Sequence, residues 1–451
     1  MITKKKKELK NSHYFFDNFK VNKILIFFIY ISPVLFILGN PFVNLFVIVI
    51  CLTFYYVRHY IKFIDKKLIW LLTILSIIFL ISSLSSDYLV YSLSKSFTYA
   101  RFLIFLVIFP ILLIKIKINI KNLGFAFSLI TFLVVIDSYI QLFFGKDIFG
   151  YSYDHNYYRL SGPFGDELVV GNFVFYFSFL SLFFLLKEIK LSNLFLILIF
   201  VFVGVFCFVS GERNTFLSFL IFMFFLFLLS KKKLLILSSG ILVISIATVL
   251  FFNVNKFNIK YKIDSVQGNA PIQKSVRVLE DVSYNSSKNE VSDISNKQLD
   301  FTYLKNKIYY SVWFSHYRAG IKIFEENKIF GSGFKTFRYY CSDRFSDANQ
   351  REKEHIICTT HPHNIYIELL SETGFVGLLF FIFISFKYLI LSIKKNYPSN
   401  HFGTSIINCL FITYLFPFKP HGSLFSTSSA YIFWFMFSIL IFNLLDKTKL
   451  K

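Results

Sequence analysis

The polar segment H-P-H-N begins at His361 and runs directly into a long apolar stretch. Its two imidazoles would therefore lie at the mouth of a membrane helix. A neutral imidazole accepts a proton near neutral pH, so His363 is a candidate general base for a hydroxyl group, with His361 and Asn364 in support. The alternative is structural: a histidine at the start of a helix that Asn364 caps. Glu368, one turn further along, and Glu372 are candidates for orienting an imidazole.

Arginine supplies a second chemical signal, because nine of the 48 basic residues are arginines and the chain otherwise uses lysine. Eight of the nine fall on or near the side of the membrane assigned below as non-cytoplasmic. They are Arg101, Arg159, Arg213, Arg277, Arg318, Arg338, Arg344 and Arg351. A planar guanidinium binds phosphate through two parallel hydrogen bonds, so this bias predicts a phosphate-bearing ligand at the outer face. Ion pairing within the long outer loop is the alternative for Arg277, Arg344 and Arg351.

Four arginines are candidates for holding such an anion. Arg213 lies in the very short outer hairpin S-G-E-R-N, where a charge is unfavourable unless it is paired or functional; Glu212 is the pairing alternative. Arg159 belongs to another outer loop and could close the site from the opposite wall. Arg318 and Arg338 flank a G-S-G turn whose N–H groups could assist an anion.

Two cysteines, Cys341 and Cys358, share the large outer loop. The compartment there is oxidising, so a disulfide between them would fix the segment that leads into His361. A zinc site formed with His355, His361 and His363 is the alternative, although the spacing fits no usual zinc pattern.

Several other polar residues have a structural interpretation. His316, Lys419 and His421 lie on the outer side and are each predicted to be interfacial or packing residues. Asp137 lies inside an apolar stretch, where ionisable groups are functional candidates by default. Pairing with Arg101 is the alternative for this carboxylate.

These residues are set in a chain built for lipid. Its 451 residues are 55% hydrophobic and 21% aromatic, with a mean hydropathy of +0.59. A soluble core does not need so much apolar surface. Repeated apolar runs of about 20 residues predict an all-α polytopic membrane protein with about twelve transmembrane helices. The predicted spans are 23–39, 41–57, 68–86, 97–114, 122–143, 167–187, 191–209, 214–230, 234–253, 364–392, 402–417 and 429–446.

Short lysine-rich joints between the spans predict the orientation. Alternating spans place these joints on one side, the cytoplasm, together with both termini. The formal charge of +22 is then a topology signal. Because the lysines form no single patch, nucleic acid is not expected as a partner.

A large outer loop divides the chain into three predicted regions. Residues 1–253 form an N-terminal transmembrane region of about nine helices. Residues 254–363 form the loop, which is predicted to be helical at Ile308–Glu326. Residues 364–451 form a C-terminal transmembrane region of about three helices.

Five segments form a recognisable series. They are R-x-S-G-x-F at 159–164, the hairpin with Arg213, the run ending in F-G-S-G-F-K-T-F-R at 319–338, H-P-H-N-x-Y-x-E-L-L-x-E-T-G-x-x-G at 361–377, and F-P-F-K-P-H-G-S-L-F at 416–425. Together they resemble the O-antigen ligase/polymerase superfamily, in order and topology over most of the chain. The H-P-H-N segment is the most specific of them.

The resemblance implies a multi-pass glycosyltransferase of the GT-C type in the bacterial inner membrane, with a periplasmic loop and a periplasmic active site. Its donor would be a glycan on undecaprenyl diphosphate. The acceptor would be lipid A–core in a ligase or a lipid-linked glycan in a polymerase, and a chain-length regulator would be a further partner. Carried onto this sequence, Arg213 and a loop arginine, Arg318 or Arg338, hold the diphosphate, and His363 activates the acceptor hydroxyl.

Diphosphate is already a good leaving group, so cationic stabilisation plus one base would suffice. The outer loops contain no D-x-D motif, and we therefore expect neither a metal ion nor a cofactor. The alternative from a different class is a flippase for lipid-linked oligosaccharides or another transporter. Such a protein should show polar groups at mid-membrane and paired discontinuous helices.

Overall fold

The computed structural model describes residues 19–153, 159–266, 311–345, 356–397 and 401–445. Within these ranges every regular element is a helix, and an isolated bridge joins Lys146 and Ser152. Eight of the described helices are long and apolar enough to cross a membrane. The predicted fold class, an all-α polytopic membrane protein, is confirmed.

The eight candidate spans lie close to predicted ones. They are Asn40–Phe63 (α4 Asn40–Leu52, α5 Phe54–Val57 and the 3₁₀ helix η1 Arg58–Phe63), α6 Lys66–Leu84, α7 Leu89–Lys115, α8 Ile120–Phe144, α9 Val170–Glu188, α12 Lys233–Val266 with its apolar part Lys233–Phe251, α18 Ile365–Asn396 and α20 Thr427–Leu444. Shorter apolar helices are α10 Asn193–Val209, α11 Arg213–Leu229 and α19 Phe402–Tyr414. The predicted total of about twelve spans stays a prediction.

The predicted span 23–39 is not one continuous helix. It consists of α2 (Phe19–Tyr30) and α3 (Ser32–Ile37), with Pro33 in the first turn of α3. Proline has no N–H to continue the hydrogen-bond ladder of the preceding helix. Gly39, with φ 97°, then turns the chain into α4.

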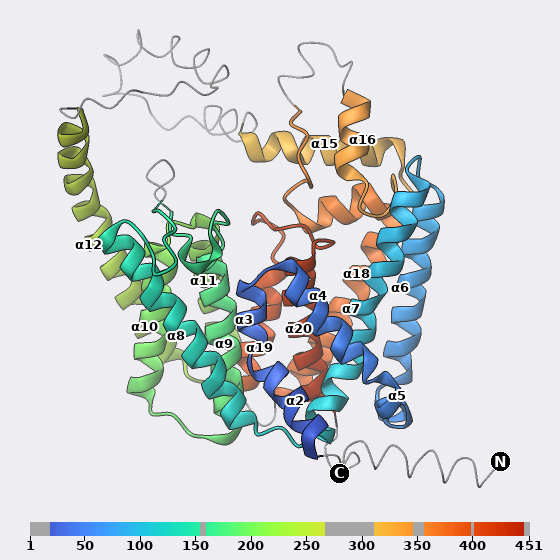
Figure 1. Cartoon of the computed structure of the whole chain (residues 1–451), viewed down its shortest axis with the longest axis horizontal. Helices are drawn as coiled ribbons and strands as arrows, with labels where there is room; N and C mark the ends of the chain where they lie inside the picture. Colours follow the sequence, from blue (N-terminus) through green and yellow to red (C-terminus); the bar gives the residue numbers. More distant parts are fainter. Residues whose placement is uncertain (1–18, 154–158, 267–310, 346–355, 398–400, 446–451) are drawn as a thin grey trace.

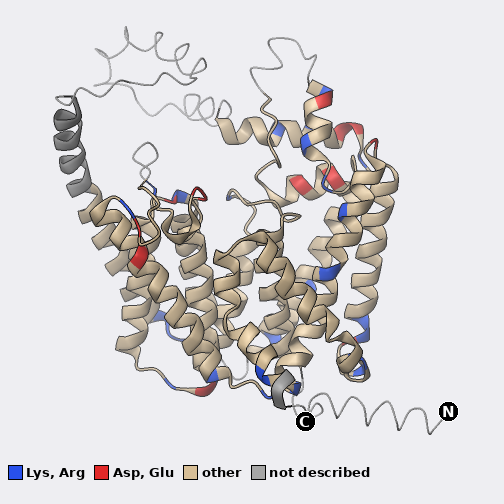
Figure 2. Ribbon diagram, viewed as in Figure 1, with Lys and Arg blue, Asp and Glu red and all other residues tan. Residues whose placement is uncertain are grey.

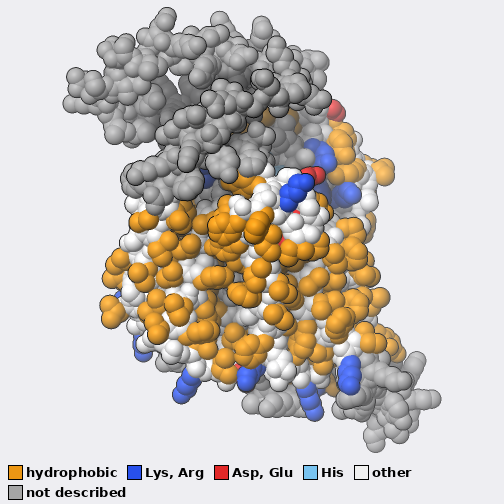
Figure 3. Space-filling model, turned by 60° about the vertical axis from the view of Figure 1, so that its left-hand side comes forward, with side chains coloured by type: hydrophobic (Ala, Val, Ile, Leu, Met, Phe, Trp, Pro, Cys, Tyr) orange, Lys and Arg blue, Asp and Glu red, His pale blue; other side chains and the backbone are white. Residues whose placement is uncertain are grey.

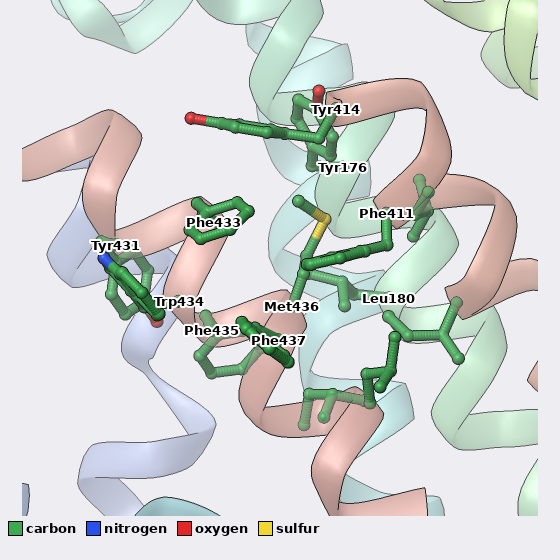
Figure 4. Close-up of a cluster of buried hydrophobic side chains, with 14 of the residues drawn as sticks. Tyr176, Leu180, Phe411, Tyr414, Tyr431, Phe433, Trp434, Phe435, Met436 and Phe437 are labelled. Atoms are coloured by element: carbon green, nitrogen blue, oxygen red, sulfur yellow. The ribbon is translucent and has the colours of Figure 1, made fainter. Parts of the chain in front are cut away.

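Helix α20 runs through the middle of the bundle (Figure 1) and supplies much of the aromatic core shown in Figure 4. Phe433 packs against Phe411 of α19, with ring centroids 5.4 Å apart. Trp434 Nε1 donates to the Tyr99 hydroxyl at 2.9 Å, and that hydroxyl donates to the Leu424 carbonyl at 3.0 Å. This chain of bonds ties the core to the loop between α19 and α20.

Apolar side chains cover the outside of the bundle. They form a broad belt in Figure 3, with Lys and Arg side chains projecting beyond its lower edge. At the opposite end, where α15 and α16 lie, acidic and basic residues are mixed (Figure 2). The belt has the composition of a lipid-facing surface, and the end that carries α15 and α16 is called the α15 end below.

The α15 end is capped by the described part of the large loop. The helix predicted at Ile308–Glu326 is α15 (Val312–Glu326), which packs against α18. It is followed by α16 (Phe337–Phe345). A disulfide between Cys341 and Cys358, with the Cα atoms 5.7 Å apart, connects α16 to the histidine segment.

Of the two boundaries predicted between the three regions, the one at 363/364 lies at the start of a helix and the one at 253/254 lies inside a helix. Helix α12 continues past residue 253 to Val266, and α18 begins at Ile365 after its N-cap Asn364. The division itself stays a prediction, because residues 267–310 of the loop lie outside the described part of the chain.

Helix α18, predicted as a single span, is broken at Gly374, which has φ 68° and ψ −172°. The chain at 328–333 fits into the break, where Phe375 N donates to the Lys328 carbonyl at 2.9 Å. A Cβ atom on Gly374 would lie 2.2 Å from the Ile329 carbonyl oxygen, so this approach requires glycine.

The G-S-G turn at 331–333 does not offer its N–H groups to an anion. Two of them donate to backbone carbonyls of α18, at 2.9 and 3.1 Å. The next N–H groups, from Lys335 and Phe337, donate to the Glu372 carboxylate at 2.6 and 3.0 Å. The prediction of an anion-binding turn is therefore wrong. Glu372 binds this turn, whereas the sequence had suggested that its carboxylate orients an imidazole.

Candidate functional site

A cavity of about 1140 Å³ opens at the α15 end of the bundle. Part of its wall is apolar and includes Phe36 of α3, Tyr176 of α9 and Ile432 of α20. Its polar lining comes from the loop before α9, the start of α11, the histidine segment before α18 and the loop between α19 and α20. The charged and imidazole side chains used below are those of Arg159, Glu212, Arg213, His361, His363, Lys419 and His421. Cations beside an apolar wall suit an amphiphilic anion.

Four of the predicted site residues line the cavity and four do not. Those that line it are Arg159, Arg213, His361 and His363. Those outside its lining are Arg318, Arg338, Asn364 and Glu368. The guanidinium that accompanies Arg213 at the cavity is therefore that of Arg159, whereas the loop arginines favoured by the sequence lie elsewhere.

Arg213 is the first residue of α11, and its side chain is exposed at the cavity. Its neighbour Glu212 is engaged by other groups. The Glu212 carboxylate accepts hydrogen bonds from Gly171 N at 2.6 Å, Asn172 Nδ2 at 3.1 Å and Thr215 Oγ1 at 2.8 Å. The pairing alternative for Arg213 is therefore wrong, and no carboxylate of the described residues forms an ion pair with it.

Glu212 is a supporting residue, which the sequence analysis named only as a possible partner of Arg213. It is 2% exposed, and this burial raises its pKa to about 7, against the opposing effects of its hydrogen bonds and of the Arg159 charge. The sequence signal for this role was an acidic residue in a hairpin that is too short to place its side chain in solvent. Glu212 ties this hairpin to the start of α9.

Arg159 is held close to the same hairpin. Its Nη2 donates to the Leu168 carbonyl at 3.0 Å, while its Nε is buried without a hydrogen-bond partner. Leu160 N donates to the Ser210 carbonyl of the hairpin at 3.0 Å. Gln141 Oε1 of α8 accepts from the next two N–H groups of the loop, at 3.0 and 2.9 Å. These bonds bring both guanidiniums to one cavity.

Three imidazoles and an indole gather at the histidine segment. The ring centroid of His363 lies 4.2 Å from that of His361, 5.0 Å from that of His316 and 5.1 Å from that of Trp313. His363 has φ 55°, a left-handed conformation uncommon for a residue with a Cβ atom. Its carbonyl accepts a hydrogen bond from His421 N at 2.8 Å. Backbone strain of this kind concentrates at functional sites.

Both histidines of the segment are neutral at physiological pH in the free protein. Burial lowers the pKa of His361 and that of His363 to about 4. Repulsion between protonated groups adds to the effect: that from His361 and His316 lowers the pKa of His363, and that from His316 and Arg338 lowers the pKa of His361. A neutral imidazole can accept a proton, as the predicted role of His363 requires.

Asn364 is the N-cap of α18, as the structural interpretation expected. Its Oδ1 accepts from Tyr366 N at 3.0 Å and from Ile367 N at 3.3 Å. Its Nδ2 also donates to the Pro417 carbonyl at 2.8 Å, in the loop between α19 and α20. The residue next to His363 thus fixes both the helix start and this loop.

Glu368 anchors the same loop. It is 2% exposed, and its carboxylate accepts from Ser423 Oγ and from Leu424 N, the latter at 2.7 Å. It supports the loop rather than an imidazole, in contrast to the predicted orienting role. The loop places Lys419 and His421 in the cavity wall. Both side chains are buried, as predicted for packing residues, but both also line the cavity.

The remaining outer arginines occupy different positions. Arg318 of α15 donates to Ser315 Oγ at 3.0 Å. Arg338 is exposed on α16. Arg344 forms an ion pair with Glu326 at 2.7 Å, which confirms the ion-pair alternative for that residue. The residues outside the described part of the chain are Arg277, Arg351 and His355.

The intramembrane carboxylate Asp137 does not pair with Arg101. Asp137 Oδ1 accepts from Ile148 N at 2.9 Å, and Arg101 Nη2 donates to Asn44 Oδ1 at 2.8 Å. The pairing alternative is therefore wrong.

The disulfide between Cys341 and Cys358 removes their sulfur atoms as zinc ligands. In the described ranges, no three side chains of His, Cys, Asp or Glu are arranged to hold a metal ion. The residue just before Cys358 is held by His316, whose Nδ1 lies 3.0 Å from the Ile357 carbonyl oxygen.

The helices and the cavity define a multi-pass α-helical membrane protein whose cationic, imidazole-lined site opens at one end of the bundle. Residues 198–382, from α10 into α18, match the family model described as O-Antigen ligase. This match covers less than half of the chain and supports the O-antigen ligase/polymerase superfamily, to which the motifs also pointed. No curated protein matches the chain.

Proposed function

We propose that this protein transfers a glycan from undecaprenyl diphosphate to a sugar hydroxyl at the periplasmic face of the inner membrane, without a metal ion. The observation that carries the proposal is the cavity that brings Arg159 and Arg213 together with His361 and His363 beside an apolar wall. Guanidiniums suit the diphosphate, and the apolar wall suits the first part of a polyprenyl chain.

In the proposed reaction, Arg159 and Arg213 bind the diphosphate of the donor. His363 accepts the proton of the acceptor hydroxyl while the hydroxyl oxygen attacks the anomeric carbon. The bond from that carbon to the phosphate oxygen breaks, and its electron pair leaves with undecaprenyl diphosphate. The two guanidiniums stabilise the charge that develops on this leaving group.

The supporting residues act through position. Asn364 caps the helix that follows His363, and Glu368 anchors the loop whose His421 N–H binds the His363 carbonyl. Arg318 and Arg338 do not line the cavity and are not part of the proposed diphosphate site.

The acceptor separates a ligase from a polymerase, since both need the same diphosphate contacts and the same base. Purified protein would receive undecaprenyl-diphosphate oligosaccharide with and without lipid A–core. A ladder of lipid-linked products without lipid A–core identifies a polymerase, and a single shift of lipid A–core identifies a ligase. Loss of turnover in EDTA, with recovery in Mg²⁺, would contradict metal independence.

A flippase is the competing function, because the break in α18 gives the bundle one discontinuous helix. The break at Gly374 is filled by the chain at 328–333, which favours packing over an ion or substrate site. Movement of the lipid-linked oligosaccharide between leaflets of proteoliposomes, with no transfer product from the native donor, would favour the flippase.

A further inference from the structure

The loop between α19 and α20 places a buried ammonium group in the wall of the cavity. This group belongs to Lys419, which is 3% exposed and lines the cavity with Arg159 and Arg213. Its Nζ lies 5.8 Å from the centroid of the Tyr414 ring. An ammonium buried to this degree is unfavourable unless an anion accompanies it.

No carboxylate of the described residues supplies that anion. Two carboxylates line the cavity, those of Glu167 and Glu212. Glu212 is engaged by Gly171, Asn172 and Thr215, and Glu167 is exposed. Burial accordingly lowers the pKa of Lys419 to about 7, with no acidic group opposing the effect. An anionic ligand in the cavity would supply the counter-charge that holds Lys419 in its ammonium form.

The loop that carries Lys419 is fixed relative to the proposed base. Asn364 Nδ2 donates to the Pro417 carbonyl at 2.8 Å, and Glu368 accepts from Leu424 N at 2.7 Å. Between these two anchors, the N–H of His421 donates to the carbonyl of His363 at 2.8 Å. These bonds fix the backbone of the loop that carries Lys419 relative to the segment that carries His363.

We infer that Lys419 is a further cation of the diphosphate site and binds the undecaprenyl diphosphate leaving group together with Arg159 and Arg213. The inference rests on the proposed function and adds a residue to it. An ammonium acts on phosphate as a compact point charge, so it complements the planar guanidiniums. A diphosphate in the cavity would supply the anion that the buried ammonium lacks.

The test measures binding of undecaprenyl diphosphate to the purified full-length protein in nanodiscs, by thermophoresis, with undecaprenol as the uncharged comparison. Lys419→Met keeps the length of the side chain and removes its charge, and Lys419→Arg restores a cation. Lys328→Met is the matched control, because Lys328 is an exposed lysine that does not line the cavity. We expect Lys419→Met to bind about 10- to 100-fold more weakly. We expect Lys328→Met to bind like the wild type and Lys419→Arg to recover most of the loss.

Thermal unfolding separates a ligand-binding role from a structural one. Lys419→Met removes an unpaired buried charge, so the Tm of the unliganded protein should be unchanged or higher, and the rise in Tm on adding undecaprenyl diphosphate should shrink. A lower Tm without ligand would overturn the inference in favour of a structural lysine.

The outcomes also separate this inference from the proposed function. Equal binding by the wild type and Lys419→Met overturns the role of Lys419 and leaves the arginine site intact. A wild type that binds undecaprenyl diphosphate no better than undecaprenol overturns both.

Discussion

The pH dependence of transfer should report a histidine with a strongly lowered pKa. Burial and two neighbouring imidazoles lower the pKa of His363 to about 4 in the free protein. The neutral form, which accepts the proton, is therefore present above about pH 4 and is lost as the pH falls through that value. Because kcat/KM reports the free enzyme, its acid limb should lie near pH 4 and not near 6.5.

The difference is large enough to measure between pH 7.5 and 5.5. An imidazole with a pKa of about 6.5 is neutral in roughly a tenth of the molecules at pH 5.5. An imidazole with a pKa of about 4 is neutral in nearly all of them. We therefore expect kcat/KM to fall less than about twofold over this range, where an ordinary histidine base would give a fall of about tenfold.

The assay follows transfer from the lipid-linked donor at subsaturating concentration over this range. Glu212 and Lys419, whose pKa values both lie at about 7, change charge as the pH falls through that value, so Glu212→Gln and Lys419→Met are measured in parallel to remove these titrations. In kcat the limb should move to higher pH, because a bound diphosphate stabilises the imidazolium. An acid limb of kcat/KM near 6.5 in the wild type and in both variants would refute the reasoning.

Three further predictions concern binding and stability. Arg213→Lys should raise the donor KM about tenfold, because an ammonium cannot make the bidentate phosphate contact; an unchanged KM would contradict this. Gly374→Ala should lower stability by about 2 kcal/mol or more in a denaturation series, because φ 68° and the Ile329 carbonyl exclude a Cβ atom. The control Gly240→Ala, in α12 with nothing within 4 Å of its Cβ position, should leave stability equal or higher. Cys341→Ser should lower Tm and transfer to the level of the reduced wild type, and identical behaviour with and without reductant in the wild type would contradict a structural disulfide.

The sequence predicted the spanning helices well because lipid leaves few options for the backbone. The span predicted at 122–143 is α8, Ile120–Phe144, since an apolar run of this length predicts a spanning helix and Asn119 and Gly145 cap its two ends. The break at Gly374 escaped prediction. It depends on the chain at 328–333 inserting into α18, which is a tertiary contact between distant segments.

The same contrast applies to the candidate site. Arg213 and His363 stood out because scarce polar residues interrupt an apolar chain. Arg338 was favoured for its place beside a glycine turn, but that turn gives its N–H groups to α18. Lys419 and Glu212 were missed as site residues because their significance lies in burial and in the partners that they have or lack. Only the folded chain reveals those properties.

The most direct test of the central claim is the rate of glycan transfer by purified His363→Ala with the native lipid-linked donor. His59→Ala, in η1 and outside the cavity lining, is the matched control. We expect kcat to fall by about 10²- to 10⁴-fold in His363→Ala, while binding of undecaprenyl diphosphate stays within a few-fold of the wild type. Full activity of His363→Ala would contradict the assignment of His363 as the base.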